Sequence, residues 1–254
     1  MTIVNQSATL GVNVQLGENV VIESGVVIGD GCLIDHNVVI YSGSRLGARC
    51  DIRAGAVLGR RPRSSPSSHR KVSDDVAPLE LKDECIVGCN AVIYAGNAIG
   101  NHVMIGDLAT IREGNRIGDR VIIGRSVTVE YDSTIHDGVI IQSGCHITDN
   151  AVIEEGVFFG VQVTTCSDNS MGLAPGFNGP YIGRHVRIGS NATILPGVRI
   201  GEHAVVSAGT LVARSVASGK IVASAAGREV MPVTQSSKAS TLIGESSLSS
   251  SHRD

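Results

Sequence analysis

Aromatic residues are scarce in this chain: they make up 3% of its 254 residues, and Trp is absent. Since 42% of the residues are nevertheless hydrophobic, the core must be built from Val, Ile, Leu and Ala, which suits a narrow solenoid interior. No segment approaches the roughly 18 unbroken apolar residues of a membrane span, and no basic start precedes an apolar run at the N-terminus. We therefore expect a cytoplasmic protein without membrane contacts.

The sequence also lacks a strong charge of either sign. A formal net charge of −3 and an isoelectric point near 6.2 give no overall attraction to nucleic acid. The six cysteines lack the paired C-x-x-C spacing of a structural zinc site. Cys32, Cys50 and Cys145 fall at inward positions of the repeat described next, so they are expected to be small core residues in a reducing compartment.

Aliphatic residues recur every six positions along most of the chain. They run from Val4 to Leu58, from Val87 to Phe159 and from Ile182 to Val212, and a glycine often follows them. A period of six fits neither an α-helix nor a simple alternating strand, but it fits short strands separated by tight corners. If three strands make one coil of about eighteen residues, equivalent side chains stack one coil apart. The sequence therefore predicts an all-β protein, a parallel β-helix.

Two segments interrupt this period. Residues 59–86 contain Arg60, Arg61, Arg63 and a Ser/Pro-rich run, and residues 166–181 are rich in Gly, Asn and Pro. Both compositions predict external loops, and long loops on a rigid scaffold often carry function. We expect one domain over residues 1–233, ending in a short C-terminal segment, and a disordered Ser-rich tail over residues 234–254.

Residues eighteen apart share one outward face of the predicted helix. One such face is an apolar stripe, which a second copy of the chain is expected to cover; a groove for an acyl chain is the alternative. A second apolar series is a candidate continuation of the stripe, although the first loop hides its phase. The stripe consists of Ile86, Met104, Ile122, Ile140 and Phe158, and the second series of Ile3, Val21, Val39 and Val57.

A neighbouring face is polar. Asn and Asp are common at tight corners, which accounts for Asn150 without any function. Glu113, Asp132 and His146 are not needed to turn a corner, so their clustering at one height predicts a binding or catalytic site. The face carries Thr110, Thr128, His146 and Thr164, with Arg112, Glu113, Glu130, Asp132, Asn150, Asp168 and Asn169 at its corners.

Several motifs lie on or beside this face: I-R-E at 111–113, V-E-Y-D at 129–132, I-Q-S-G at 141–144, V-T-T-x-x-D-N-x-M-G at 163–172 and L-G-R-R-P at 58–62. Over most of residues 80–232 they resemble the hexapeptide-repeat N-acyltransferases that act on nucleotide-linked 3-amino-dideoxyhexoses. The resemblance implies a left-handed β-helix, a homotrimer with coenzyme A between adjacent subunits, and transfer of an acyl group, usually acetyl, from acyl-CoA without a metal. That family normally has V-E-N-D, so Tyr131 departs from its pattern and leaves the sugar open.

The resemblance places Glu113, Tyr131 and Asp132 beside the amino sugar. Acyl transfer to an amine needs a route for the lost proton. Asp132 is expected to accept it or to orient the amine together with Glu113; His146, whose ordinary pKa is near neutrality, or the departing thiolate are alternatives. Further substrate contacts are expected from Glu130, Asn150, Asp168, Asn169 and Arg60, and coenzyme A contacts from Ala208, Gly209, Arg214 and Lys220.

Three other functions compete with this hypothesis. A lipid A type acyltransferase that uses acyl carrier protein also carries an I-R-E motif, but it needs a deep apolar groove and a basic docking patch. A carbonic anhydrase on the same helix needs three His on one zinc ion, and His102, His136 and His146 do not obviously converge. A non-catalytic scaffold would show no thioester turnover.

Overall fold

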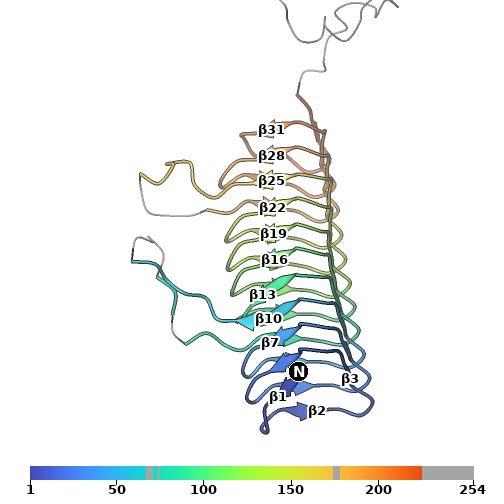
Figure 1. Ribbon diagram of the computed structural model, residues 1–254. Coiled ribbons are helices and arrows are strands. Elements are labelled where there is room, and N and C mark those ends of the chain that lie inside the picture. The colour runs from blue at the N-terminus through green and yellow to red at the C-terminus, as the bar shows by residue number, and fades with distance from the viewer. Residues whose placement is uncertain (67–70, 74, 174–177, 225–254) are drawn as a thin grey trace, which may run out of the picture. The chain divides into compact units, whose positions relative to one another are not determined.

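The computed structural model describes residues 1–66, 71–73, 75–173 and 178–224. Over these residues the chain is all β and contains no helix. Short strands follow one another around a stack of coils, and each strand pairs in parallel with its equivalents one coil away (Figure 1). The predicted parallel β-helix is confirmed, and its coiling is consistent with the left-handed form.

The strands form three parallel sheets, here named A, B and C. Sheet A contains β1 (Ile3–Val4), β4 (Val21–Ile22), β7 (Val39–Ile40), β10 (Val57–Arg60), β13 (Val92–Tyr94), β16 (Thr110–Ile111), β19 (Thr128–Val129), β22 (His146–Ile147), β25 (Thr164–Thr165), β28 (Thr193–Ile194) and β31 (Leu211–Val212). Sheet B contains β2 (Thr9–Leu10), β5 (Val27–Ile28), β8 (Arg45–Leu46), β11 (Glu80–Leu81), β14 (Ala98–Ile99), β17 (Arg116–Ile117), β20 (Thr134–Ile135), β23 (Val152–Ile153), β26 (Tyr181–Ile182) and β29 (Arg199–Ile200). Sheet C contains β3 (Gln15–Leu16), β6 (Leu33–Ile34), β9 (Asp51–Ile52), β12 (Ile86–Val87), β15 (Met104–Ile105), β18 (Ile122–Ile123), β21 (Ile140–Ile141), β24 (Phe158–Phe159), β27 (Arg187–Ile188), β30 (Val205–Val206) and β32 (Ile221–Val222).

The second residue of most strands points into the core. In sheet A, Ile111 pairs with Val129 one coil away, and both side chains are fully buried. Side chains of adjacent coils therefore stack in columns, and this stacking removes apolar surface from water along the length of the β-helix. The predicted inward positions of three cysteines are confirmed, and a fourth lies inward too; these buried residues are Cys32, Cys50, Cys85 and Cys145.

The corners explain why glycine, asparagine and aspartate recur. A Cβ atom on Gly124 would lie 2.7 Å from the backbone nitrogen of Ser143 in the next coil, so no side chain fits there. Asp132 and Asn150 have positive φ angles of 56° and 53°, a backbone region that Asn and Asp adopt more readily than most residues. The six-residue spacing thus determines both which side chains point into the core and where the chain turns.

Both predicted loops leave the helix at the corner between sheets A and B, hereafter the A–B corner. The first follows β10 and the second follows β25, and both project on the same side (Figure 1). The first loop is shorter than the predicted 59–86, because Leu79 and Leu81 are already buried in the next coil and Cys85 belongs to its core. One six-residue repeat after a polar segment is too short a pattern to show where the chain re-enters the β-helix.

The apolar stripe lies on the outward side of sheet C, where Ile122 pairs with Met104 and with Ile140. The candidate continuation does not belong to it, since Val21, Val39 and Val57 are strand residues of sheet A. The expectation that the two series share a face is therefore wrong. The coil with the first loop spans 35 residues, from Val57 to its partner Val92, instead of eighteen, so spacing alone could not assign the face.

Two further expectations concern membranes and the C-terminus. In the part of the chain that the structure describes, no helix is long and apolar enough to cross a membrane. The end of the predicted closing segment, residues 225–233, and the predicted tail, residues 234–254, lie outside the described residues.

Candidate functional site

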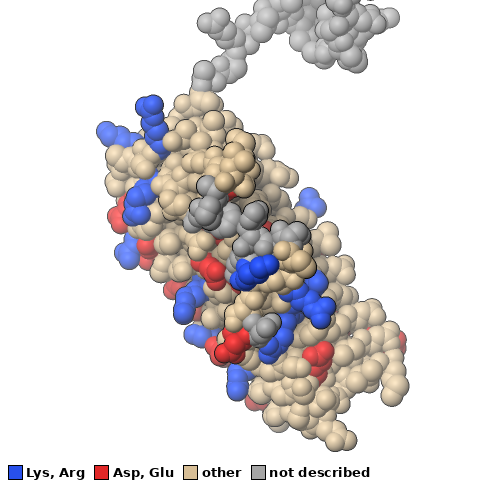
Figure 2. Space-filling model, turned by 90° about the vertical axis from the view of Figure 1, so that its left-hand side faces the viewer, with Lys and Arg blue, Asp and Glu red and all other residues tan. Residues whose placement is uncertain are grey.

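The A–B corner between the two loops gathers polar and aromatic side chains from four successive coils. Tyr94 is the last residue of β13, Arg112 and Glu113 follow β16, and Glu130 to Asp132 follow β19. Figure 2 faces the side from which the loops project and shows basic and acidic side chains close together on it. The next coil adds Thr148, Asp149 and Asn150.

At the centre of this cluster, Arg112 forms a two-pronged ion pair with the adjacent Glu113. The Nε atom lies 3.0 Å from Oε2 and the Nη2 atom 3.1 Å from Oε1. Nη1 also lies 3.5 Å from Oε2 of Glu130 in the next coil. Burial acts to lower the pKa of Arg112, but the hydrogen bond to Glu113 and the charges of both glutamates raise it above its ordinary value. Arg112 is therefore a fixed cation.

Two tyrosines sandwich this arginine. The guanidinium carbon of Arg112 lies 5.4 Å from the ring centre of Tyr94 and 5.9 Å from that of Tyr131. Arg60, at the root of the first loop, lies 5.4 Å from the same Tyr94 ring. These distances are in the range of cation–π contacts. Arg60 thus joins the cluster through an aromatic ring, and its predicted contact with the substrate stays a prediction.

Sequence reasoning missed Tyr94 and gave Arg112 no role. A signal was available for both. Tyr94, Arg112 and Glu130 are spaced eighteen residues apart, so they occupy one column of the corner. An aromatic residue is unusual in a chain with only 3% aromatics, and its column position could have singled it out.

A buried polar ladder holds the corner backbone behind the site. The side-chain oxygen of Asn97 accepts from the backbone N–H of Asn115 (2.9 Å), and that of Asn115 accepts from the N–H of Ser133 (2.8 Å). The amide of Asn115 also donates to the carbonyl of Arg112 (2.7 Å), and that of Asn97 to the carbonyl of Tyr94 (2.8 Å). Because all these polar groups form hydrogen bonds, the ladder holds the backbone of Arg112 and Tyr94 in place at the corner.

Asp132 lies beside this ion pair. Its backbone N–H donates to the carbonyl of Glu113 (3.1 Å), and its exposed side chain lies over Gly114, where a Cβ atom would be 2.2 Å from Oδ1. Glu113, in contrast, is only 3% exposed. The structure therefore brings Glu113, Glu130, Tyr131 and Asp132 together, with the last of them the most accessible carboxylate.

His146 has a different position. It is the first residue of β22 and its half-buried side chain points outward from sheet A, between Thr128 and Thr164 in the register. It lies on the face that leads to the corner and not at the corner itself. The polar residues predicted to share a face thus form a row on the outward side of sheet A, and the carboxylate cluster lies at one edge of that row.

The neighbouring coil holds a second carboxylate centre at Asp149, which is 5% exposed. It accepts hydrogen bonds from Ser167 Oγ (2.7 Å), Asn150 Nδ2 (2.9 Å) and Thr148 Oγ1 (3.2 Å). Ser167 belongs to the root of the second loop, so Asp149 ties that loop to the corner. The amide of Asn150 is directed toward Asp149.

Asp168 organises the second loop in the same region. Its carboxylate accepts from the Ser170 hydroxyl and backbone N–H (2.6 Å each) and from the Gly172 N–H (2.7 Å). These hydrogen bonds, the hydroxyl first, lower the pKa of Asp168. Asn169 beside it is exposed. Both predicted residues lie near the site, and Asp168 is engaged in turning the loop.

The four predicted coenzyme A residues do not form one site within a single chain. Ala208 and Gly209 lie at the corner between β30 and β31, hence between sheets C and A. Arg214 follows β31 and precedes the bridge from Val216 to sheet B, and Lys220 precedes β32 of sheet C. All four are exposed. Three different corners of the last coils therefore carry them.

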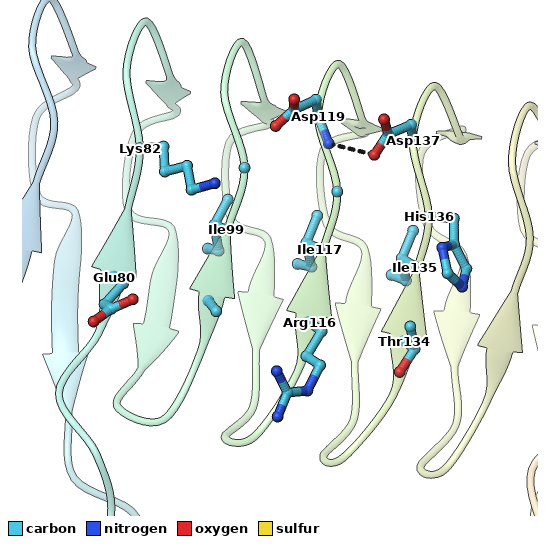
Figure 3. A pocket seen from close by; sticks show the side chains of 13 residues that line it. Glu80, Lys82, Ile99, Arg116, Ile117, Asp119, Thr134, Ile135, His136 and Asp137 are labelled. Atoms are coloured by element: carbon cyan, nitrogen blue, oxygen red, sulfur yellow. Dashed lines mark hydrogen bonds between the residues drawn. The ribbon is translucent and has the colours of Figure 1, made fainter.

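A groove of about 450 Å³ crosses the outward side of sheet B, away from this cluster. Ile99, Ile117 and Ile135 lie along its floor, and Lys82 and Arg116 supply cations (Figure 3). At its rim, the N–H of Asp119 donates to the carboxylate of Asp137 (2.9 Å), the dashed contact in the figure. The six-residue repeat did not predict this groove.

The histidines weighed for a zinc site lie apart. His102 pairs with Glu84 (3.0 Å), His136 lies 3.9 Å from Glu154, and His146 belongs to sheet A. Across the described ranges, no group of three or more His, Cys, Asp or Glu side chains is arranged to hold a metal ion.

Known proteins share the repeats and the fold. Residues 25–60 and 179–214 match the family described as "Bacterial transferase hexapeptide (six repeats)". A stretch of 41 residues is 63% identical to "Putative acetyltransferase YvoF" of Bacillus subtilis (strain 168) and covers 16% of this chain and 24% of that protein. The match thus spans about a quarter of the curated relative's length. The two matched segments of this chain are thus similar to the repeats of hexapeptide transferases.

One solved structure has a similar fold. The UDP-N-acetylglucosamine acyltransferase of Arabidopsis superimposes with a TM-score of 0.58 at 19% identity, over 88% of this chain and 69% of that one, and at this identity the likeness concerns the fold alone. PerB from Caulobacter crescentus, solved with CoA and GDP-perosamine, has a TM-score of 0.20 at 14% identity, over 88% and 55% of the two chains, which carries no conclusion about the fold.

Proposed function

We propose that the protein is an acyl-CoA-dependent N-acyltransferase that transfers an acyl group, in the simplest case acetyl, to the amino group of a nucleotide-linked amino-deoxy sugar. The observation that carries this proposal is the carboxylate cluster at the A–B corner. Three carboxylates, those of Glu113, Glu130 and Asp132, gather there, and Arg112 pairs with the first two. Carboxylates attract an ammonium group and can accept its proton.

The three carboxylates have different roles in this proposal. Glu113 is buried and held by both prongs of Arg112, so it positions the cluster. Glu130 and Asp132 are more accessible and receive the sugar amine. Tyr131, whose ring lies against Arg112, forms a wall for the sugar ring. Asn150, Asp168 and Asn169 shape the side of the site next to the second loop.

The reaction follows from that arrangement. The amine must first lose a proton, and Asp132 accepts it, with His146 as the alternative base. The nitrogen lone pair then attacks the thioester carbonyl, the C–N bond forms, and collapse of the tetrahedral intermediate breaks the C–S bond. Coenzyme A leaves as a thiolate, which takes up the remaining proton. The products are an amide and free coenzyme A.

Coenzyme A is proposed to lie between subunits of a cytoplasmic homotrimer. Ala208, Gly209, Arg214 and Lys220 lie at three corners of one chain, so they contact a single ligand only if different subunits supply them. The apolar stripe on sheet C, in which Ile122 is 38% exposed and Met104 is 47% exposed, supports such packing. Sedimentation velocity gives the number of copies, and a monomer would contradict this arrangement.

The test is release of the coenzyme A thiol from acetyl-CoA in the presence of nucleotide-linked 3-amino and 4-amino deoxyhexoses. Thiol release is expected with at least one amino sugar and not with the matching sugar that carries a hydroxyl in place of the amine. Mass spectrometry of the product should show one added acetyl group on nitrogen. Transfer only to hydroxyl acceptors, or only from a long-chain acyl carrier protein, would refute the proposal and favour a lipid A type reaction. No turnover with any donor would favour a scaffold.

A further inference from the structure

A second polar groove lies at the A–B corner, on the N-terminal side of the first loop. Its volume is about 430 Å³. It shares Arg60 with the carboxylate cluster and contains none of the cluster's carboxylates. Its lining consists of Glu23, Tyr41, Ser42, Arg60, Arg61 and Arg63.

The charges of this groove suit an anion. Three arginines line it against one carboxylate, that of Glu23. This carboxylate is fixed on the groove wall, since its Oε2 atom accepts hydrogen bonds from the Ser42 backbone N–H (3.0 Å) and hydroxyl (2.7 Å). Guanidinium groups bind phosphate oxygens with paired hydrogen bonds, and clusters of them are typical of phosphate recognition.

The groove also contains an aromatic ring and a hydrogen-bond acceptor. Tyr41 is half-buried beside the arginines, and it is one of three tyrosines on this corner in a chain that has four. A planar base can stack on such a ring. The remaining lone pairs of the Glu23 carboxylate can accept a hydrogen bond from a sugar hydroxyl, as acidic residues do from ribose in dinucleotide-binding proteins.

Arg60 connects the groove with the carboxylate cluster. It lines the groove and also lies over the ring of Tyr94. The guanidinium carbon of Arg112 lies 5.4 Å from the centre of the same ring. Tyr41 follows β7 and Arg112 follows β16, three coils further, which corresponds to about 14 Å along the helix axis at the usual strand spacing. A ligand with a base at one end and a reacting group at the other can span this distance along a single corner.

We propose that this groove binds a nucleoside diphosphate, with Arg61 and Arg63 on the phosphates, Glu23 on a sugar hydroxyl and Tyr41 against the base. The inference rests on the proposed function for its placement beside the acceptor cluster. Two ligands of the reaction contain this group: the nucleotide-linked sugar and the adenine nucleotide of coenzyme A. The cluster at the far end of the same corner favours the nucleotide-linked sugar.

The test is equilibrium binding by isothermal titration calorimetry to the full chain, with UDP, dTDP, GDP, 3′,5′-ADP and coenzyme A as probes. Arg61→Gln and Arg63→Gln are each expected to weaken binding of at least one pyrimidine or guanine nucleoside diphosphate by about tenfold, because each removes a charge-assisted phosphate contact. Arg45→Gln is the matched control: Arg45 is an exposed arginine of the nearby β8, on the outward side of sheet B. It should bind like the wild type, and circular dichroism checks that all three variants keep the fold.

The five probes distinguish the nucleotide-linked sugar from coenzyme A as the ligand of the groove. Weaker binding of only 3′,5′-ADP and coenzyme A assigns the groove to the adenine nucleotide of the donor and overturns its assignment to the nucleotide-linked sugar. Unchanged binding of all five probes in both groove variants, or an equal loss in Arg45→Gln, overturns the proposal. Because this readout needs no turnover, nucleotide binding can be demonstrated even where no amino sugar is acylated, and acylation can be demonstrated even where both groove variants bind normally.

Discussion

Replacing Arg112 with methionine is expected to abolish most acyl transfer and to lower the free energy of unfolding by about 2 kcal/mol. Glu113 is almost fully buried, and without Arg112 its carboxylate loses both prongs of its ion pair. Removing one side chain of a buried ion pair is strongly destabilising; the partial exposure of Arg112, 31% of its side chain, reduces the expected cost. Urea denaturation and thiol release measure the two effects.

A double variant separates charge from packing. In Arg112→Met with Glu113→Met, the buried carboxylate is removed together with the arginine that holds it, so stability is expected to return close to that of the wild type while turnover stays low. Arg112→Lys is expected to restore little activity, because an ammonium group cannot reproduce the two-pronged contact. A double variant as unstable as Arg112→Met alone would show that the unpaired carboxylate is not the cause.

Ile123→Ala is expected to lower the free energy of unfolding by about 3 kcal/mol. The side chain is fully buried in the core of the β-helix, where it stacks on Ile105 and Ile141 of the adjacent coils. Truncation leaves a cavity in a narrow core that cannot collapse around it without moving whole coils. Denaturant unfolding followed by circular dichroism gives the value.

The neighbouring residue provides a control for this result. Ile122 precedes Ile123 in β18 and points outward, with 38% of its surface exposed. At concentrations where the chain is monomeric, Ile122→Ala is expected to change stability by no more than about 0.5 kcal/mol. Equal losses in the two variants would contradict the inward and outward assignment on which the faces of the helix depend.

Most of the fold could be predicted because the repeat carries its own register. Ile111 and Val129 are eighteen residues apart in sequence and adjacent in the sheet, so counting alone finds their contact. Counting failed where a loop of unknown length intervened. Val57 and Ile86 were candidates for one face, yet they lie in sheets A and C, because the return of the coil at Leu79 was not visible in the sequence.

Less of the candidate site could be predicted. The sequence placed Glu113, Tyr131 and Asp132 at one corner, where the structure also has them. It did not predict that Arg112 holds Glu113, since two consecutive residues at a corner can point together or apart. Arg60 meets Tyr94 across an irregular pairing between β10 and β13, a backbone feature that no spacing rule gives.

The central claim, that the A–B corner is the site of acyl transfer, is tested most directly by Asp132→Asn. Asn accepts the positive φ of this position, so the corner should keep its shape while it loses the proton acceptor. Asp30→Asn, the same change at an exposed aspartate between sheets B and C, is the control. Thiol release with the best amino-sugar substrate should fall about a hundredfold in Asp132→Asn and stay unchanged in Asp30→Asn; wild-type rates in both would contradict the account.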